Sequence, residues 1–248
     1  PQVGQQYTYD FESSATAQLV NKESVETSVA IRGQAVISVG ENCGYTLTLQ
    51  NVVASGADNA KQNVKDFITH SVQFTLSGDE ISPEICADTA DGVFSLNVKR
   101  GIISAFQSGS QSSTDLDIFG KCPVVASSST NGDITTITRQ RDLDKCAYRE
   151  KLINGIMQSV VTESSDIKTS PLLNGNVESE SKFQNGVLQS TDIRETYNYL
   201  PFSTNQHGAK AKVATKLTLK KTADGVANPP KTPVHRSILF GNANEKLG

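Results

Sequence analysis

The chain has 248 residues, 36% hydrophobic and 20% charged, so it is long enough to bury a core without a metal or dense disulfide cross-links. No apolar run approaches the roughly 18 residues that a membrane helix needs. Charge is uneven, because residues 201–248 carry 8 basic and 2 acidic side chains although the net charge is −3. This asymmetry suggests either an anionic partner for the C-terminal part or a solvated strand face.

The composition favours strands, because Val, Ile and Thr are plentiful and Trp is absent. Alternating apolar and polar residues predict strands at residues 7–11, 29–39, 45–49 and 67–76. Gly33 interrupts the second of these strands in the manner of a β-bulge. The polar stretch 54–63 predicts a surface loop.

The middle of the chain changes character twice. Residues 93–98 alternate like a strand, and helical spacing follows, because Val98, Ile102 and Phe106 are four residues apart. Residues 118–126 and 134–141 predict a hairpin. Residues 142–151 then predict a helix, with acidic residues in the first turn, where the helix dipole favours them.

Strands resume from residue 153 to residue 219. Asn185-Gly186 predicts a tight turn that joins residues 177–183 to residues 187–200. Pro229, Pro230 and Pro233 end the strand pattern. We therefore expect one β domain over residues 1–228 and a Pro-containing linker over residues 229–248.

Enzyme motifs are missing from the sequence. It has no phosphate-binding glycine loop, no G-x-S-x-G elbow and no H-E-x-x-H pair. His70, His207 and His235 form no local catalytic or metal-binding pattern. We expect no enzyme activity, no cofactor and no metal site.

The four cysteines are even in number and contain no C-x-x-C pair. They are either thiols of a cytosolic protein or two disulfides of a secreted one, with three pairings possible. Cys122 opens one strand of the predicted hairpin, and Cys146 lies on the predicted helix after the other strand. A bond between them would pin that helix to the sheet, so we favour Cys122–Cys146 and Cys43–Cys86.

A cationic face is predicted near the C-terminus. The period of two places Lys210, Lys212, Lys216 and Lys220 on one side of a strand and apolar residues on the other. Like charges along one face repel each other, so an anionic partner such as heparan sulfate or an anionic lipid surface would fit. Protection of an edge strand by lysine explains the same pattern.

Three segments occur in an order typical of one family. They are residues 97–107 with Arg100-Gly101-Ile102, residues 120–123 with Cys122-Pro123, and residues 139–146 with Arg141-Asp142-Leu143 before Cys146. With the aromatic start Tyr7-Thr8-Tyr9, they resemble the N-terminal domain of the large lipid transfer proteins: vitellogenins, apolipophorins, the apolipoprotein B class and the microsomal triglyceride transfer protein. The resemblance covers essentially the whole chain. The four cysteines and the lack of a long polyserine tract make it most similar to an apolipophorin.

The resemblance implies a mainly β fold: a barrel-like antiparallel sheet of the lipovitellin type, wrapped around a central helix that we expect at residues 142–151. It implies a secreted, extracellular lipid-transport protein in which lipid lies in later domains, after a helical domain that the linker would reach. The chain itself would be a receptor-binding and assembly module, with no nucleic-acid partner. The family's contact with lipoprotein receptors carries over to Thr138, Arg139, Arg141 and Lys145. Alternatives are the head module of a secreted clotting or yolk-storage lipoprotein and a lumenal lipid-transfer subunit.

Overall fold

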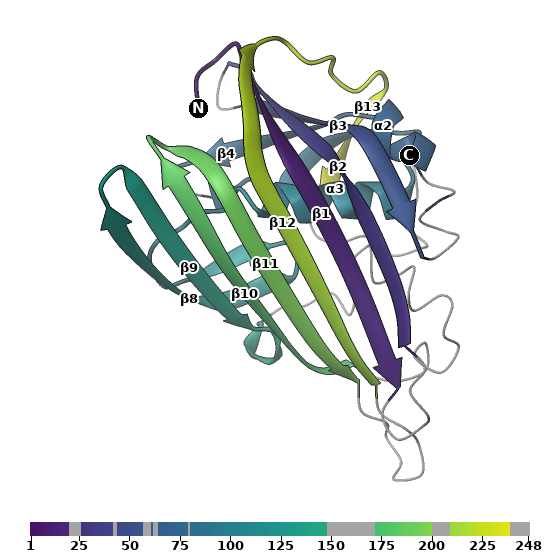
Figure 1. Cartoon of the computed structure of the whole chain (residues 1–248), viewed down its shortest axis with the longest axis vertical. Coiled ribbons are helices and arrows are strands. Elements are labelled where there is room, and N and C mark those ends of the chain that lie inside the picture. The colour runs from purple at the N-terminus through teal and green to yellow at the C-terminus, as the bar shows by residue number, and fades with distance from the viewer. Residues whose placement is uncertain are drawn as a thin grey trace.

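The structure is a computed structural model that describes residues 1–19, 26–41, 44–56, 61, 64–78, 80–147, 172–199 and 209–238 (Figure 1). Its strands are β1 (Gln5–Leu19), β2 (Glu26–Val39), β3 (Gly44–Ser55), β4 (Val72–Ser77), β5 (Glu80–Ile81), β6 (Glu84–Asp88), β7 (Ser113–Asp117), β8 (Gly120–Asn131), β9 (Ile134–Asp142), β10 (Leu172–Gln184), β11 (Val187–Tyr199), β12 (Ala209–Asp224) and β13 (Pro233–Ser237). The helices are α2 (Val64–Thr69), α3 (Val93–Ser104) and the 3-10 turn η1 (Leu143–Lys145). The fold is mainly β, as expected.

One large antiparallel sheet forms the domain. Its strand order is β13-β6-β4-β3-β2-β1-β12-β11-β10-β9-β8-β7, and β5 pairs with β4 beside this path. The middle of the sheet joins the two ends of the chain, since β1 pairs with β12 from Gln5 opposite Asp224 to Leu19 opposite Ala209. Within the described ranges the sheet ends at β13 and β7 and is open, so it is not the closed barrel that tight wrapping would require.

Local strand signals are confirmed. The strands expected at residues 7–11, 29–39 and 45–49 lie within β1, β2 and β3. The pairing of β2 with β3 shifts register around Gly33, where a Cβ would lie 3.0 Å from the carbonyl oxygen of Gln50. Asn185 and Gly186 both have positive φ (51° and 76°), the conformation of a type I′ turn between β10 and β11.

The helices differ from the predictions. The central helix is α3 rather than residues 142–151: Asp142 ends β9, η1 is only one turn, and residues 148–151 lie outside the described residues. Residues 93–98, expected as a strand, are the first half of α3. Likewise, α2 precedes β4 within the strand expected at 67–76.

The spacing of Val98, Ile102 and Phe106 correctly predicted the later part of α3, and burial explains why the start of this helix was predicted as a strand. It is covered on several sides, and its buried residues are Ser95, Leu96, Asn97, Val98, Lys99, Arg100, Ile102 and Ile103. A helix buried in this way has no single apolar stripe, so its first residues imitate strand alternation. Across the described residues, no helix is long and apolar enough to cross a membrane.

Aromatic side chains connect α3 to the sheet, and Figure 1 shows the helix against the face of the sheet that lies away from the viewer. Phe106, just after α3, contacts Tyr9 of β1 and Phe74 of β4, with ring centroids 5.6 and 6.1 Å apart. Phe67 of α2 contacts Phe94 of α3 at 5.7 Å. These rings belong to one hydrophobic core that draws on both halves of the sheet.

Part of the expected linker belongs to the sheet. Within residues 229–248, Pro233–Ser237 form β13, which pairs with β6, and Ile238 is buried. Proline begins this strand at the edge of the sheet, where no ladder hydrogen bond is lost. Residues 239–248 lie outside the described residues, so the domain boundary after residue 228 stays a prediction.

Candidate functional site

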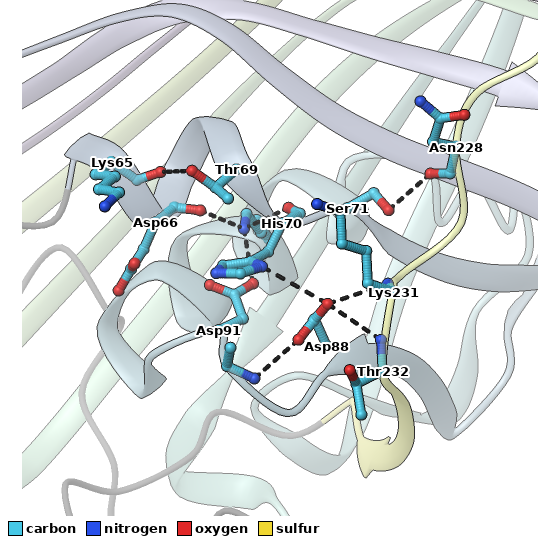
Figure 2. A network of polar contacts seen from close by, with 12 residues as sticks. Lys65, Asp66, Thr69, His70, Ser71, Asp88, Asp91, Asn228, Lys231 and Thr232 are labelled. Carbon is cyan, nitrogen blue, oxygen red and sulfur yellow. Dashed lines mark hydrogen bonds and ion pairs between the residues drawn. The ribbon is translucent and has the colours of Figure 1, made fainter.

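A network of buried polar side chains joins α2, α3 and the segment after β12 (Figure 2). At its centre, Lys99 of α3 is fully buried. Its Nζ donates to Asp91 Oδ2 at 2.7 Å, to the carbonyl oxygen of His70 at 2.7 Å and to that of Asp66 at 3.1 Å. Three acceptors match the three hydrogens of the ammonium group, which offsets much of the cost of burying it.

Asp91 is the buried counter-ion of this lysine. It lies just before α3, where the helix dipole favours negative charge, and both side chains are fully inaccessible to solvent. Desolvation raises the pKa of Asp91 and lowers the pKa of Lys99, while the attraction between the two charges opposes both shifts. Such a pair adds little net stability but is costly to break.

A second carboxylate, Asp88 at the end of β6, fixes residues 225–232, which we call the strap. Asp88 Oδ2 accepts hydrogen bonds from the backbone N–H groups of Lys231 at 3.1 Å and Thr232 at 3.3 Å. Its Oδ1 accepts another from the N–H of Ala90 at 2.9 Å. One buried carboxylate therefore ties the strap to the start of α3.

His70 and Ser71 complete this attachment. His70 Nδ1 lies 3.7 Å from Asp88 Oδ2, and the hydroxyl of Ser71 donates to the carbonyl of Asn228 in the strap at 2.9 Å. Burial acts to raise the pKa of Asp88, but the backbone N–H groups that it accepts from, together with His70, lower it below its usual range. Asp88 therefore stays ionised throughout the neutral range and keeps the strap in place.

Arg100 extends the network to the last described strand. Its Nε donates to the carbonyl of Ser237 in β13 at 3.1 Å, and its guanidinium also donates to Asn97 Oδ1 at 2.9 Å. Asn97 and Arg100 are three residues apart and share a face of α3. The Asn-x-x-Arg motif of the sequence therefore attaches β13 to the central helix.

One of the two expected disulfides is confirmed. Cys122 of β8 and Cys146, just after η1, form a disulfide that closes a separation of 24 residues. Cys86 has a free thiol, and burial raises the pKa of that thiol. The expected Cys43–Cys86 bond is therefore not formed in this structure, and Cys43 lies outside the described residues.

The arginines expected to contact a receptor point inward. Ile137, Arg139 and Arg141 alternate on the buried face of β9, and both arginines are at most 7% exposed. Arg139 donates to the carbonyl of Gly109 at 2.6 Å, and the Arg141 guanidinium lies 5.2 Å from the centre of the Phe119 ring. These contacts attach Gly109 and Phe119 to β9, and receptor binding by Arg139 and Arg141 stays a prediction.

Two other members of that segment are accessible. Thr138 is half-buried on the outer face of β9 and bonds Ser127 across the hairpin. The side chain of Lys145 in η1 is 72% exposed, with Nζ 4.0 Å from Asp142 Oδ2. Only these two of the four expected receptor contacts can meet a partner without rearrangement.

The predicted lysine face exists, but it does not lie on an edge strand. Lys210, Lys212, Lys216 and Lys220 are all exposed on β12, which lies between β1 and β11. Edge protection is therefore the wrong explanation for these lysines.

Neighbouring strands neutralise half of this face. Lys216 stands opposite Glu12 on β1 and Asp192 on β11, and Lys220 Nζ lies 3.8 Å from Asp10. Lys210 stands between Gln18 and Asn198, and Lys212 between two threonines. Among the described residues, the positive charge of this face that β1 and β11 leave uncompensated is thus confined to the Lys210–Lys212 end.

The sequence reasoning missed the buried network. Asp88 and Asp91 were not predicted as site residues, although one signal was available: the adjacent cations Lys99 and Arg100 interrupt the otherwise uncharged segment 93–107. A cation that is buried among apolar residues needs hydrogen-bond acceptors, and the carboxylates nearest in sequence are those just before the helix. No cluster of three or more His, Cys, Asp or Glu suited to a metal ion is found among the described residues.

The open antiparallel sheet packed against a buried helix defines the class of fold, which is that of lipovitellin. A solved structure entitled "Lipid-protein interactions in lipovitellin" matches 98% of this chain and 28% of its own, with a TM-score of 0.76 and 14% sequence identity, which establishes the shared fold. The vitellogenin N-terminal domain family matches residues 2–225. The chain belongs to this family.

Sequence relatives agree with that assignment. The apolipophorins of Manduca sexta are 38% identical over 237 residues, and those of Drosophila melanogaster are 35% identical over 242 residues. A vitellogenin of Penaeus merguiensis is 20% identical over 152 residues. The chain covers 7% of the length of each of these apolipophorins.

Proposed function

We propose that this chain is the N-terminal module of a large secreted lipoprotein that transports lipid, with the bulk lipid held by other domains. The supporting observation is the identity of 35–38% to apolipophorins over 96% of the chain. The Cys122–Cys146 disulfide fits an oxidising, extracellular compartment. Purification of the full-length protein from extracellular fluid, followed by density flotation and lipid analysis, tests this. A lipid-free or intracellular protein would contradict it.

Within that protein, we propose that the module takes part in assembly. The strap and β13 lie at the C-terminal end of the described chain, and Asp88 and Arg100 fix both to the rest of the domain. A correctly oriented exit from this module would help the next part of the protein to pack. Arg100→Met in the full-length protein should therefore reduce secretion of lipid-loaded particles. Unchanged secretion by a folded variant would argue against an assembly role.

We also propose that the module contacts lipoprotein receptors and anionic surfaces through exposed lysines. Receptor modules of this kind present acidic, calcium-bound sites, which pair with basic side chains in a salt-dependent manner. Lys145 is the exposed cation of the segment that was predicted to bind a receptor. Lys210 and Lys212 carry the positive charge that no neighbouring strand compensates.

A matched pair of double variants tests this assignment on immobilised heparin and on a calcium-loaded lipoprotein-receptor ectodomain. Lys210→Ala with Lys212→Ala should elute from heparin at clearly lower salt. Lys216→Ala with Lys220→Ala removes equal charge from locally neutralised positions and should have a smaller effect. Lys145→Ala should weaken binding to the receptor ectodomain but leave elution from heparin unchanged. Equal effects of the two double variants would show that only net charge matters.

A second candidate function is yolk storage. The similarity to the Penaeus merguiensis vitellogenin, over 58% of this chain, favours it as the alternative. The two functions differ in the fate of the particle, because a storage protein is retained after uptake whereas a transporter is released again. Labelled full-length protein that accumulates in oocytes without returning to the extracellular fluid would favour storage.

A further inference from the structure

The described part of the domain contains an aromatic cavity that neither the buried network nor the lysine face uses. Its volume is about 290 Å³, and its walls come from both halves of the sheet. Tyr7 and Tyr9 of β1 line it on one side, Phe183 of β10 on another, and Phe106 extends from the end of α3. Core, sheet and central helix therefore all contribute to one cavity, which is open to solvent on one side.

The walls carry no charged side chain, and the one charged group among the described lining residues is the N-terminal amine of Pro1. Among the described residues that line the cavity, none is Asp, Glu, Lys, Arg or His. The hydroxyl of Tyr9 is occupied, since it donates to the carbonyl of Leu188 at 2.8 Å, and the hydroxyl of Tyr7 accepts from the N–H of Gln2. What these tyrosines offer a ligand is mainly carbon surface.

Packing holds the walls in position. Phe106 meets Tyr9 edge-on at 5.6 Å and also contacts Phe74, which stacks on Tyr45 at 5.4 Å. Tyr9 is buried, and Phe106 and Tyr45 are partly buried and pack against the same core. A preformed cavity of this kind loses little entropy when a ligand enters.

Hydroxyl groups mark the solvent side. Ser108, Ser110, Ser128 and Thr135 also line the cavity, and they are more exposed than the aromatic residues Tyr7 and Tyr9. These groups can exchange hydrogen bonds with an uncharged polar head, but they cannot neutralise a carboxylate or a phosphate. The cavity is therefore polar at its mouth and apolar within.

We propose that this cavity binds one neutral single-chain lipid with a hydroxyl head group, in the manner of a monoacylglycerol. The chain lies among Tyr7, Tyr9 and Phe106, and the head group lies at the serine-rich mouth. An apolar cavity of about 150 Å³ accommodates benzene, so 290 Å³ corresponds to about twelve carbon atoms. The site is separate from the bulk-lipid domains of the proposed transport function, and it is testable on this chain alone.

The test is calorimetric titration of the 248-residue chain with monomeric 1-lauroylglycerol, alongside laurate at pH 8. We expect saturable 1:1 binding of the glyceride and weaker binding of laurate, because the cavity has no cationic side chain and only the N-terminal amine of Pro1 could pair with a carboxylate. Tyrosine fluorescence should respond, since Tyr7, Tyr9 and Tyr45 are three of the six tyrosines. No saturable binding of the glyceride, or equal affinity for laurate, overturns the proposal.

Two matched variants locate the site. Val187→Trp fills the cavity wall at a partly buried position and should weaken binding at least tenfold. Val125→Trp makes the same change at a valine that is 67% exposed and outside the cavity, and should bind like the wild type. If the first variant does not fold, Leu76→Trp on the opposite wall replaces it. Undiminished binding by a folded cavity-filling variant places the ligand elsewhere and refutes the assignment.

Discussion

Replacement of Lys99 by methionine isolates the contribution of the buried ion pair. The new side chain is of similar length and apolar, so the packing of α3 is largely kept. It leaves the Asp91 carboxylate without its counter-ion and the carbonyls of Asp66 and His70 without the donor they share. Breaking one partner of a buried pair typically costs about 3–5 kcal/mol.

That cost is large for a domain whose total stability is expected to be about 5–15 kcal/mol. Urea unfolding followed by far-UV circular dichroism measures it, since the chain has no Trp for fluorescence. Lys65→Met, at an exposed lysine of α2, is the matched control and should change stability by less than about 0.5 kcal/mol.

A double-mutant cycle separates pairing from packing. Asp91→Asn combined with Lys99→Met should cost about 1–3 kcal/mol less than the sum of the two single changes, because both remove the same interaction. The reasoning is refuted if Lys99→Met stays within 1 kcal/mol of the wild type. Strict additivity in the cycle would equally show that the two charges are not coupled.

Three further outcomes are expected. Cys122→Ser with Cys146→Ser should lower the free energy of unfolding by about 3 kcal/mol, as loop closure over 24 residues predicts, and unchanged urea midpoints would contradict this. Because the folded-state pKa of Asp88 is lowered, its contribution to stability is complete above the usual Asp range and is lost as pH falls through that lowered value. The amide NMR shift of Lys231 should report this titration below the usual Asp pKa of about 3.9; a midpoint at or above that value argues against it. Tyr9→Phe should cost about 0.5–1.5 kcal/mol through loss of its buried hydrogen bond, and wild-type stability would mean that this bond adds nothing.

Features set by neighbouring residues could be predicted from the sequence. The alternation over residues 7–11 belongs to β1, and Asn185-Gly186 forms the turn that its positive φ angles require. The Cys122–Cys146 bond followed from the hairpin that brings the two positions near each other. In each case the signal is local, because a strand period or a turn needs only a few consecutive residues.

Features that depend on distant contacts could not be predicted in this way. The alternation over β9 defines two faces but does not indicate which of them is buried. The available clue was that Arg139 shares a face with Ile137, an apolar residue that is buried. The acceptor that makes burial of Arg139 possible is the carbonyl of Gly109, thirty residues away. The start of α3 imitates a strand because the core surrounds it, and only the tertiary structure supplies that information.

The pairing of β1 with β12 also has a consequence for synthesis on the ribosome. Tyr7 and its neighbours leave the exit tunnel early, whereas their partners near Thr222 arrive more than 200 residues later. Synthesis proceeds at about 5–20 residues per second, so the edge of β1 that pairs with β12 in the folded domain stays unpaired for roughly 10–40 s. During that interval β1 pairs only with β2, and its other edge can bind stray strands. While it folds, this domain is therefore most prone to aggregate just before β12 emerges, and a chaperone that covers the β1 edge would act at that moment.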